Sequence, residues 1–454
     1  MQKAPAHRAK PPCRREDALA VLQRLRQAGH LAYFAGGCVR DMLMGHPPAD
    51  WDIATDAPPP RVRQLFSNTQ AVGQAFGVIL VRHGTSVVEV ATFRTDDRYL
   101  DGRRPSQVRF ATPQEDAQRR DFTINALFHD PLEDKVIDFV GGRQDLDAHL
   151  VRAVGQPEAR FAEDHLRLLR AVRFAARFAF TIEPATAAAI AQHAPLLTRI
   201  SPERTADELR LMLTPPTRSA AWQMLWSYRL VDVLFRFMGS GWTGNLDASQ
   251  CIFMATAPGQ SIGFGLALAA AVLSWCQQAN PTEDLRPLLQ HASVKRMVRA
   301  MRQALKISNE ESEQMAGTME ALGPLLAAEP PGVAPLKRFL ASPQAEDSRR
   351  LLAAIRSIGL HARRIEHLET QFKEMAGQPV APTPLISGDD LTAAGLKPGP
   401  LFGRLLAAVY DAQLEDRVRD KAQALQLAMA LASGTAADSC DYCQNGPCKG
   451  MCRD

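Results

Sequence analysis

Two aspartates at alternate positions are the residues of this sequence best suited to metal-assisted chemistry. Asp50 and Asp52 flank Trp51 just before a short apolar run. Side chains alternate along an extended strand, so both carboxylates lie on one face and repel each other unless a cation lies between them. Mg²⁺ is commonly held by one or two carboxylates together with substrate phosphates. An ordinary surface turn is the alternative interpretation.

A glycine pair upstream and a carboxylate downstream strengthen the chemical interpretation. Gly36 and Gly37 separate a short apolar run from an amphipathic stretch. Glycines at such a strand-to-helix turn let backbone N–H groups approach an anion, although many such turns are purely structural. Glu89 lies in a second apolar strand, where an unpaired carboxylate is costly. Three acidic groups near a glycine turn predict two-metal phosphoryl or nucleotidyl transfer, with an ion pair between Glu89 and Arg94 as the alternative for Glu89.

Five motifs, in this order, resemble those of the class II nucleotidyltransferases of the polymerase β superfamily. They occur at residues 36–41, 50–55, 119–127, 163–167 and 201–209. The family contains the CCA-adding tRNA nucleotidyltransferases and the bacterial poly(A) polymerases. The resemblance covers residues 33–213 and implies a small mixed-sheet catalytic head followed by a helical neck, body and tail.

The resemblance implies a reaction and a set of site residues. The 3′-hydroxyl of an RNA attacks the α-phosphate of a nucleoside triphosphate, and pyrophosphate leaves. Asp50 and Asp52 would hold two Mg²⁺ ions, one lowering the pKa of the hydroxyl and one neutralising the departing triphosphate, with Glu89 as a third carboxylate. The implied nucleotide-binding residues are Gly36, Gly37, Arg40, Arg120, Asp121, Asn125, Glu163, Asp164, Arg167 and Arg170.

Asp164 and Arg167 indicate how a base is chosen without a nucleic-acid template. On a helix, residues three or four apart share a face, which places an acceptor beside a forked donor. Cytosine and adenine offer an amino donor beside a ring-nitrogen acceptor, whereas uracil and guanine present the opposite order. The pair is therefore expected to accept CTP and ATP and to leave a buried group unpaired against UTP or GTP. A solvated ion pair is the alternative.

Residues 119–125 are predicted to begin a helix, with Asp121 as the N-cap and Asn125 four residues later. An ordinary capped helix is one interpretation. The resemblance instead implies contacts of Arg120, Asp121 and Asn125 with the incoming ribose and phosphates, through which a ribonucleotide is chosen over a deoxyribonucleotide.

Two further segments bear on the substrate. Residues 94–105 are charged and bounded by glycine and proline, and they resemble the flexible loop that participates in the change from CTP to ATP in CCA-adding members and is absent from CC-adding members. Lys397 lies in the turn 395–400, whose backbone donors suit an RNA phosphate at the start of a helix. A simple joint between two helices is the alternative for this turn.

The elements that must position these residues form an α/β nucleotidyltransferase head, a small mixed β-sheet with helices, followed by an all-α neck, body and tail. Apolar periodicity predicts a helix at 15–28, strands at 31–35 and 136–140, and a hairpin at 78–91. The predicted domains are a catalytic head (15–150), a neck with the nucleotide-selecting motif (151–215), a body (216–380), an RNA-binding tail (381–435) and a cysteine-rich extension (436–454).

Composition narrows the class of protein. A chain of 454 residues exceeds the roughly 250–300 that one core supports, and 46% hydrophobic with 22% charged residues excludes wholesale disorder. The net charge of +4 is too small to identify a polyanionic partner. The longest apolar run, 262–276, is shorter than the ~20 residues of a membrane span, and the first residues lack an apolar signal segment. A cytoplasmic protein with no membrane association and no obligatory protein partner is expected.

The eight cysteines fall into two groups. Cys440, Cys443, Cys448 and Cys452 lie close together and could wrap a tetrahedral Zn²⁺, with an iron–sulfur cluster or exposed thiols as alternatives. The remaining four are expected to be ordinary thiols: Cys13, Cys38, Cys251 and Cys276.

The sequence therefore predicts a template-independent RNA nucleotidyltransferase that uses Mg²⁺ and adds CCA to tRNA 3′ ends from CTP and ATP. The alternative is a bacterial poly(A) polymerase, which would use the same catalytic residues. Residues 71–79 lack the arginine-rich segment that many bacterial poly(A) polymerases have after the glycine of this region. Those enzymes also have a long basic extension at the tail, which is not seen in this sequence. A non-catalytic RNA-binding protein is disfavoured because Asp50, Asp52 and Arg120 are intact.

Overall fold

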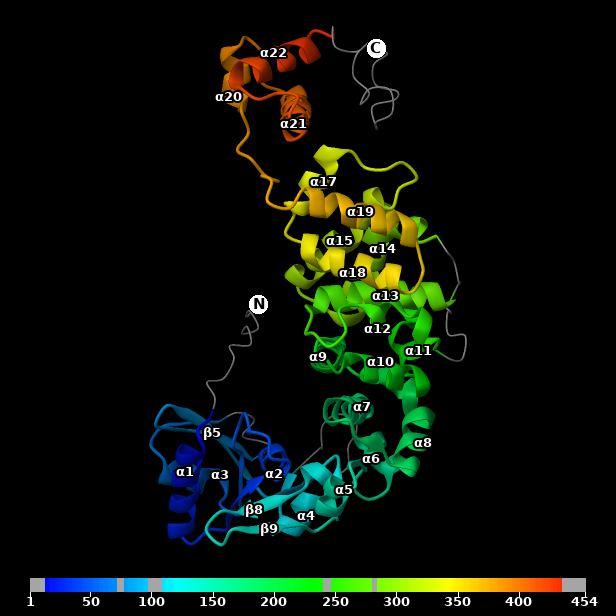
Figure 1. Cartoon of the computed structure of the whole chain (residues 1–454). Coiled ribbons are helices and arrows are strands. Elements are labelled where there is room, and N and C mark those ends of the chain that lie inside the picture. Colours follow the sequence, from blue (N-terminus) through cyan, green and yellow to red (C-terminus); the bar gives the residue numbers. More distant parts are fainter. Residues whose placement is uncertain (1–12, 72–76, 97–107, 240–245, 280–283, 435–454) are drawn as a thin grey trace.

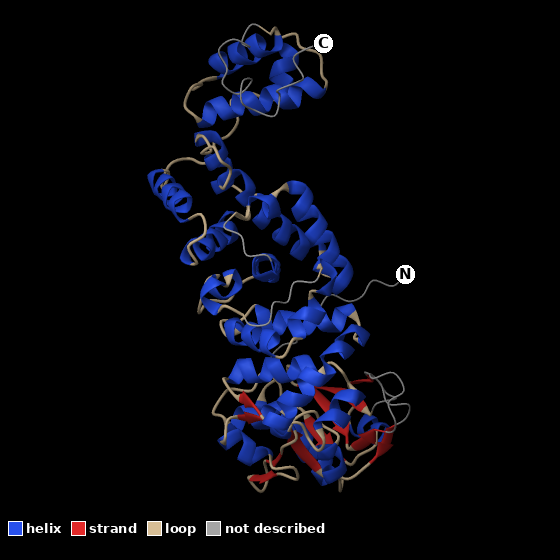
Figure 2. Cartoon of the chain, turned by 90° about the vertical axis from the view of Figure 1, so that its right-hand side faces the viewer, coloured by secondary structure: helices blue, strands red, loops and turns tan. Residues whose placement is uncertain are grey.

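The computed structural model describes residues 13–71, 77–96, 108–239, 246–279 and 284–434. The chain is elongated, with its strands gathered in the head at one end and helices filling the remainder up to the tail at the other end (Figures 1 and 2). The predicted architecture, a mixed α/β head followed by helices, is confirmed.

The main sheet of the head has the strand order β3-β4-β5-β2-β1-β8-β9 within the described residues. Its strands are β1 (Ala32–Ala35), β2 (Ile53–Thr55), β3 (Thr69–Ala71), β4 (Val78–His83), β5 (Ser86–Thr92), β8 (Phe128–Asp130) and β9 (Lys135–Ile137). β2 pairs in parallel with β5, and the other neighbours are antiparallel. The predicted hairpin is β4–β5, whereas the predicted strand 136–140 ends at Ile137, where Asp138 turns to bind the backbone amides of residues 140–143.

Two small strand pairs accompany this sheet. β6 (Arg94–Asp96) pairs with β7 (Val108–Phe110), and β10 (Leu150–Val151) pairs with β11 (Thr181–Ile182). The helices of the head are α1 (Arg15–Gln27), α2 (Gly37–Leu43), α3 (Pro59–Leu65), α4 (Pro113–Gln118) and α5 (Gly142–Asp147), with a 3₁₀ turn at Thr123–Asn125.

The two faces of the sheet have different roles. Along β5 the side chains of Val88 and Val90 are buried, and α1 contacts this strand and β1. Glu89 and Ala91 alternate with them and are only half-buried, because side chains of a strand point to opposite faces. One face therefore packs on the main core, and the other carries a smaller buried cluster, which includes Ala35 and Ala54, and leaves room for a site.

Helices form the rest of the chain. The neck contains α6 (Pro157–Glu163), α7 (Arg167–Phe178), α8 (Pro184–His193) and α9 (Pro202–Leu213). The following helices are α10 (Arg218–Ser227), α11 (Leu230–Leu234), α12 (Ile252–Ala255), α13 (Phe264–Ala279), α14 (His291–Leu305), α15 (Asn309–Glu320), α16 (Leu322–Leu325), α17 (Val333–Leu340), α18 (Ala345–Ser357) and α19 (Ala362–Glu374). The last three are α20 (Gly388–Ala393), α21 (Pro400–Leu414) and α22 (Lys421–Ala432).

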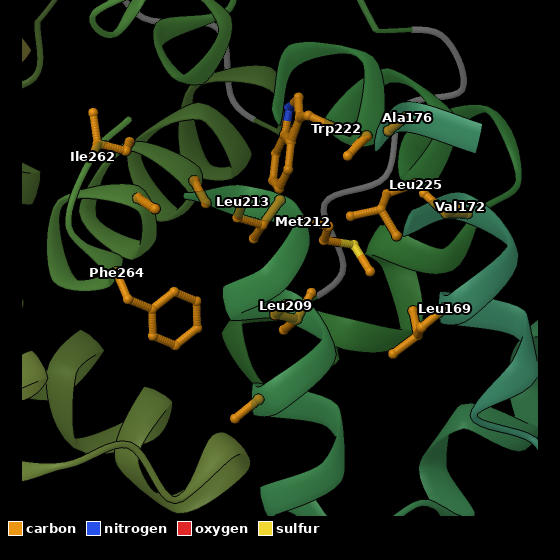
Figure 3. Packing of buried hydrophobic residues seen from close by; sticks show 14 of the residues in the cluster. Leu169, Val172, Ala176, Leu209, Met212, Leu213, Trp222, Leu225, Ile262 and Phe264 are labelled. Atoms are coloured by element: carbon orange, nitrogen blue, oxygen red, sulfur yellow. The ribbon is translucent and has the colours of Figure 1, made fainter. Parts of the chain in front are cut away.

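One apolar core runs from the head into the body. Figure 3 shows Leu169 and Val172 of α7 beside Leu209 and Met212 of α9, with α10 packed against both. These residues belong to a cluster that extends from the first head helix to α19, and the apolar helix α13 is buried within it as predicted. No helix within the described ranges has the length and apolar character needed to traverse a bilayer.

The tail has a core of its own. Its buried residues are Ile386, Leu391, Leu405, Val409, Ala412, Val418, Ala424 and Ala428. Helices α20, α21 and α22 contact one another around this cluster. The tail therefore packs as a separate small helical unit.

Candidate functional site

A cavity of about 540 Å³ lies where the half-buried face of the sheet meets α7 and α9. Asp52 is the residue just before β2, Glu89 comes from β5, and the glycine turn contributes Gly36 and Gly37. Arginines form much of the remaining wall: Arg40, Arg94, Arg119, Arg120, Arg167, Arg170, Arg173, Arg177 and Arg204. A few carboxylates facing many guanidinium groups suit a ligand that carries several negative charges.

The glycine turn joins β1 to α2 as predicted, and Gly36 cannot be replaced without strain. Its φ is +74°, and a Cβ built there would lie 2.7 Å from Nη1 of Arg120. That guanidinium is fixed, because Nη1 donates to the carbonyl of Asn125 at 3.0 Å and Nε donates to Asp116 at 3.1 Å. The absence of a side chain at Gly36 therefore lets the backbone pack directly against Arg120 of the cavity wall.

Asp52 and Glu89 occupy neighbouring positions of the parallel pair. Ile53 of β2 is in register with Val90 of β5, so the residues immediately before them, Asp52 and Glu89, lie side by side. Both line the cavity, whereas Asp50 is exposed in the loop before β2 and is absent from the lining. The structure therefore brings two of the three predicted carboxylates together.

This donor set fits a magnesium ion that also binds substrate. Among the described residues, no three His, Cys, Asp or Glu side chains form a preassembled metal site. Mg²⁺ does not require one, since it retains several waters and is usually bound through one or two carboxylates and the phosphates of the substrate. Asp52 and Glu89 could supply such carboxylates, and Asp50 lies two residues from Asp52.

Asp121 is held in its ionised state at the centre of the site. One of its oxygens accepts hydrogen bonds from the amide of Phe122 at 2.8 Å and from Nδ2 of Asn125 at 3.1 Å, and the other accepts from Nε of Arg170 at 2.8 Å. Burial by itself raises the pKa of Asp121, but Arg170 and Asn125 outweigh it and lower the pKa to about 2. Arg40 donates to the side-chain oxygen of Asn125, which ties this network to the glycine turn.

The predicted helix over 119–125 is wrong. Helix α4 ends at Gln118, Arg119 is its C-cap, and Thr123–Asn125 form only a 3₁₀ turn. Asp121 therefore does not cap a helix. It receives hydrogen bonds from Asn125 and Arg170 inside the cavity wall, where a tight turn brings Arg120, Asp121 and Asn125 together.

The expectation that Asp164 and Arg167 share one helix is also wrong. Helix α6 ends at Glu163, Asp164 has an extended backbone with φ −143°, and α7 begins at Arg167. Both side chains still line the cavity, whereas Glu163 does not. Nη1 of Arg167 donates to Oε2 of Glu163 at 2.6 Å, and Oδ2 of Asp164 accepts from Nη2 of Arg204 at 2.7 Å.

Sequence reasoning missed several residues of the wall. Besides Arg94 and Arg119, these are Arg173, Phe174, Arg177 and Arg204. The signal for α7 was present, since Arg167, Arg170, Arg173 and Arg177 recur every three or four residues and therefore share one helix face. Arg204 lies in the motif at 201–209, but nothing in that motif indicated that the side chain reaches the cavity from α9.

Other predicted residues lie away from the cavity or outside the described part of the chain. Lys397 is exposed between α20 and α21, just before the N-cap Gly399. The predicted loop at 94–105 is described only as far as Asp96, and residues 72–76 and the zinc candidates Cys440, Cys443, Cys448 and Cys452 are outside the described residues. Of the other cysteines, Cys13, Cys38 and Cys251 are buried and Cys276 is half-buried, as expected of ordinary thiols.

Two sequence families match consecutive parts of the chain. Residues 32–152 match the family described as "Poly A polymerase head domain", and residues 179–240 match "Probable RNA and SrmB- binding site of polymerase A". The first match contains the sheet with Asp52 and Glu89, and the second contains α9 with Arg204.

Curated relatives of two kinds match about half of the chain. The CCA-adding enzyme of Bacillus subtilis is 46% identical over 218 residues, which is 48% of this chain and 55% of that protein. Poly(A) polymerase I of Salmonella typhi is 41% identical over 246 residues, 52% of this chain and 53% of that protein. The matched region spans about half the length of these relatives.

A solved structure extends the similarity over nearly the whole fold. The crystal structure of the Bacillus stearothermophilus CCA-adding enzyme in complex with CTP has a TM-score of 0.72 to this chain, with 29% sequence identity. The alignment covers 94% of this chain and 99% of that chain.

Proposed function

Because the chain belongs to the class II nucleotidyltransferases, the family of CCA-adding enzymes and bacterial poly(A) polymerases, we propose that it adds CCA to tRNA 3′ ends. CTP and ATP are the proposed substrates, and no nucleic-acid template is used. The observation that carries the proposal is the single cavity that joins Asp52 and Glu89, an arginine wall and the Asp164/Arg167 pair. These groups match the three parts of a nucleoside triphosphate: phosphates, ribose and base.

The phosphates are proposed to lie between the glycine turn and the two carboxylates. The backbone N–H of Gly37, at the first residue of α2 and on the cavity lining, would meet the phosphate oxygens, whereas that of Gly36 donates to the carbonyl of Leu127. Asp52 and Glu89, with Asp50 nearby, would hold Mg²⁺, which supplies Lewis-acid stabilisation of charge on the phosphates and lowers the pKa of a bound hydroxyl. The carboxylates thereby orient the phosphates for attack by the RNA 3′-hydroxyl, and pyrophosphate leaves.

The ribose is proposed to contact the 3₁₀ turn. Asp121 and Asn125 already bind each other, so their geometry is fixed before a nucleotide enters. Arg120 is similarly fixed by Asp116. A preorganised polar group that meets a ribose hydroxyl favours a ribonucleotide, because a deoxyribonucleotide leaves that group unpaired.

The base is proposed to be read by Asp164 as acceptor and Arg167 as donor. Asp164 follows the last residue of α6 and Arg167 is the first residue of α7, so both can line the cavity without sharing one helical face. Cytosine and adenine complement this pair, and uracil and guanine do not.

The second candidate is poly(A) addition, which is favoured by the similarity to poly(A) polymerase I. The deciding experiment incubates purified protein with a tRNA lacking its CCA end and supplies CTP and ATP singly and together. Incorporation limited to three nucleotides with both substrates supports CCA addition. Long adenosine tracts made from ATP alone support the second candidate, and no extension at all contradicts both.

The domain division and the RNA contacts belong to the same proposal. The head (15–150) and neck (151–215) would perform the reaction, and the body (216–380) and tail (381–435) would hold the RNA, with Lys397 at a phosphate ahead of α21. A cytoplasmic location remains a prediction from the sequence.

A further inference from the structure

Arg204 makes an ion pair with the residue proposed to accept hydrogen bonds from the base. From α9, its Nη2 donates to Oδ2 of Asp164 at 2.7 Å, and the side chains are only 25% and 18% exposed. The other carboxylate oxygen of Asp164 accepts from the amide of Leu166 at 3.1 Å. The carboxylate is therefore held at both oxygens, once by its own turn and once from a helix forty residues away in sequence.

Arg167, the second member of the base-reading pair, is held by different partners. Its Nη1 donates to Oε2 of Glu163 and to the carbonyl of Arg160, and Nη2 donates to the carbonyl of Arg119. The hydrogen bonds described for the side chains of Asp164 and Arg167 are thus with separate neighbours. Each can then point toward a base while it is held at the back.

Without Arg204, other cations compete for the Asp164 carboxylate. Arg170 is one of them, because Asp164 lies close enough to raise the pKa of the Arg170 guanidinium, as Asp121 and Glu208 also do. Arg167 is three residues away along the turn. A carboxylate released from Arg204 is expected to swing toward one of these guanidinium groups, because charge-assisted pairs are strongly favoured in a partly buried site.

We propose that Arg204 is a positioning residue for base selection: it fixes the Asp164 carboxylate as an acceptor for the amino group of cytosine or adenine. The inference rests on the proposed function and assigns a role in that site to a residue of α9. Since Arg204 acts through Asp164, its loss should weaken the incorporation of CTP and ATP. Incorporation of the wrong nucleotides should stay the same or increase. The carbonyl that uracil presents is repelled by a fixed carboxylate and is less repelled by a displaced one.

The test compares Arg204→Leu and Arg204→Lys with a matched variant of the same helix. Arg210 also lies on α9 and forms ion pairs with Glu311 and Asp207, but it is outside the cavity lining. Single-nucleotide incorporation into tRNA is measured with CTP, ATP and UTP separately. For Arg204→Leu we expect kcat/KM for CTP and ATP to fall roughly 10- to 100-fold, mainly through KM, with UTP incorporation unchanged or higher.

The controls separate positioning from simple loss of structure. Arg204→Lys keeps the charge and should restore part of the preference for CTP over UTP, and Arg210→Leu should leave that preference as in the wild type. Within an Asp164→Asn background, Arg204→Leu should have little further effect, since the group it positions is already altered. If Arg204→Leu fails to fold, the binding of CTP and UTP is measured on Arg204→Lys and on Asp164→Asn instead. The proposal then predicts a reduced preference for CTP in both variants.

Two results would overturn the inference. An Arg204→Leu protein that selects CTP over UTP as well as the wild type refutes it, and so does an equal loss of kcat/KM for all nucleotides. Failure of the proposed function is a different outcome, in which the wild-type protein itself extends no RNA.

Discussion

Asp52 and Glu89 gain their proposed role from strand register. Asp52 precedes β2 and Glu89 lies in β5, and the parallel pairing of the two strands places them next to each other at the cavity. Two neighbouring carboxylates repel each other in a partly buried site unless a cation lies between them. At the scale of single residues, replacing either carboxylate is therefore expected to affect catalysis directly.

Asp52→Ala tests that pair. We expect incorporation of both CTP and ATP to fall about 10³-fold or more, because charge on the phosphates is no longer stabilised through this carboxylate. Affinity for tRNA should remain close to that of the wild type. Steady-state incorporation and an RNA-binding titration provide the two measurements. Asp56→Ala, a control at the other end of β2 that pairs with His30, should retain turnover, and substantial turnover by Asp52→Ala would contradict the assignment.

Asp121 makes the stability of the head dependent on pH. Its pKa is about 2 in the folded protein, compared with an ordinary 3.8. A carboxyl whose pKa is lowered by folding stabilises the folded state when the pH is above the pKa of the unfolded chain. This contribution of roughly 2 kcal/mol is lost as the pH falls from about 4 toward 2. Denaturant unfolding at pH 5.5 and pH 2.5 should therefore show a clearly larger stability advantage over Asp121→Asn at the higher pH. An equal difference at both pH values would refute this role.

At the scale of elements, the β1–α2 turn depends on a glycine. Gly36→Ala would add a methyl group 2.7 Å from Nη1 of Arg120, at a backbone φ of +74° that L side chains rarely adopt. Gly45 is a matched control, because its φ is +72° and nothing lies within 4 Å of a Cβ there. We expect Gly45→Ala to cost about 1 kcal/mol in unfolding free energy through the backbone alone.

Gly36→Ala should lower the unfolding free energy by more than Gly45→Ala does, and it should also weaken nucleotide binding. The displaced Arg120 can no longer keep its bonds to Asp116 and to the carbonyl of Asn125, so KM for nucleotides should rise together with the loss of stability. Thermal unfolding and nucleotide KM measured on both variants provide the comparison. The expectation fails if the two substitutions have the same effect on KM.

Prediction from the sequence succeeded where the signal was local periodicity. The strand before Gly36, the hairpin β4–β5 and the buried helix α13 all follow from alternating or continuous apolar residues. It failed at 119–125 and 163–167, where charged residues at helical spacing form turns instead. Those turns are held by non-local ion pairs, such as Asp121 with Arg170 and Asp164 with Arg204, which no local pattern reveals.

The same reason explains which site residues were found. Gly36, Asp52 and Arg120 lie in motifs whose chemistry can be read along the chain, whereas the motif at 201–209, which contains Arg204, gives no sign of a role in the cavity. Arg204 reaches the cavity only because α9 packs against α7, as the apolar contacts in Figure 3 illustrate. Packing of two helices is a tertiary property, and sequence spacing does not report it.

At the scale of the whole molecule, the parts are connected in two different ways. The core that begins in the head continues through the neck and body, so motion of one part is resisted by buried apolar contacts. The tail has a separate core and meets the body where α17 contacts α21. The net charge of +4 reveals neither arrangement, because it sums the arginines of the cavity with carboxylates throughout the chain.

A buried lysine is central to the contact between body and tail. Lys337 of α17 is only 6% exposed at its side chain, and its Nζ donates to the carbonyl of Leu414 at 2.7 Å, at the last residue of α21. The partial negative charge of a helix C-terminus favours an ammonium group there. Next to it, Arg338 pairs with Asp411 of the same helix. Two adjacent cations thus fix α21 to the body.

Lys337→Met should loosen the tail while it keeps the apolar stem of the side chain. Loss of a buried hydrogen bond to a charged group costs about 1.5–3 kcal/mol, so the docked tail becomes less populated and affinity for tRNA should fall roughly tenfold. Nucleotide selection should be unchanged, because the cavity lies at the opposite end of the molecule (Figure 1). Small-angle scattering and a tRNA-binding titration, with the exposed Lys373→Met as control, measure both effects. A more extended molecule that binds tRNA as tightly as the wild type would show that docking of the tail is not required for RNA binding.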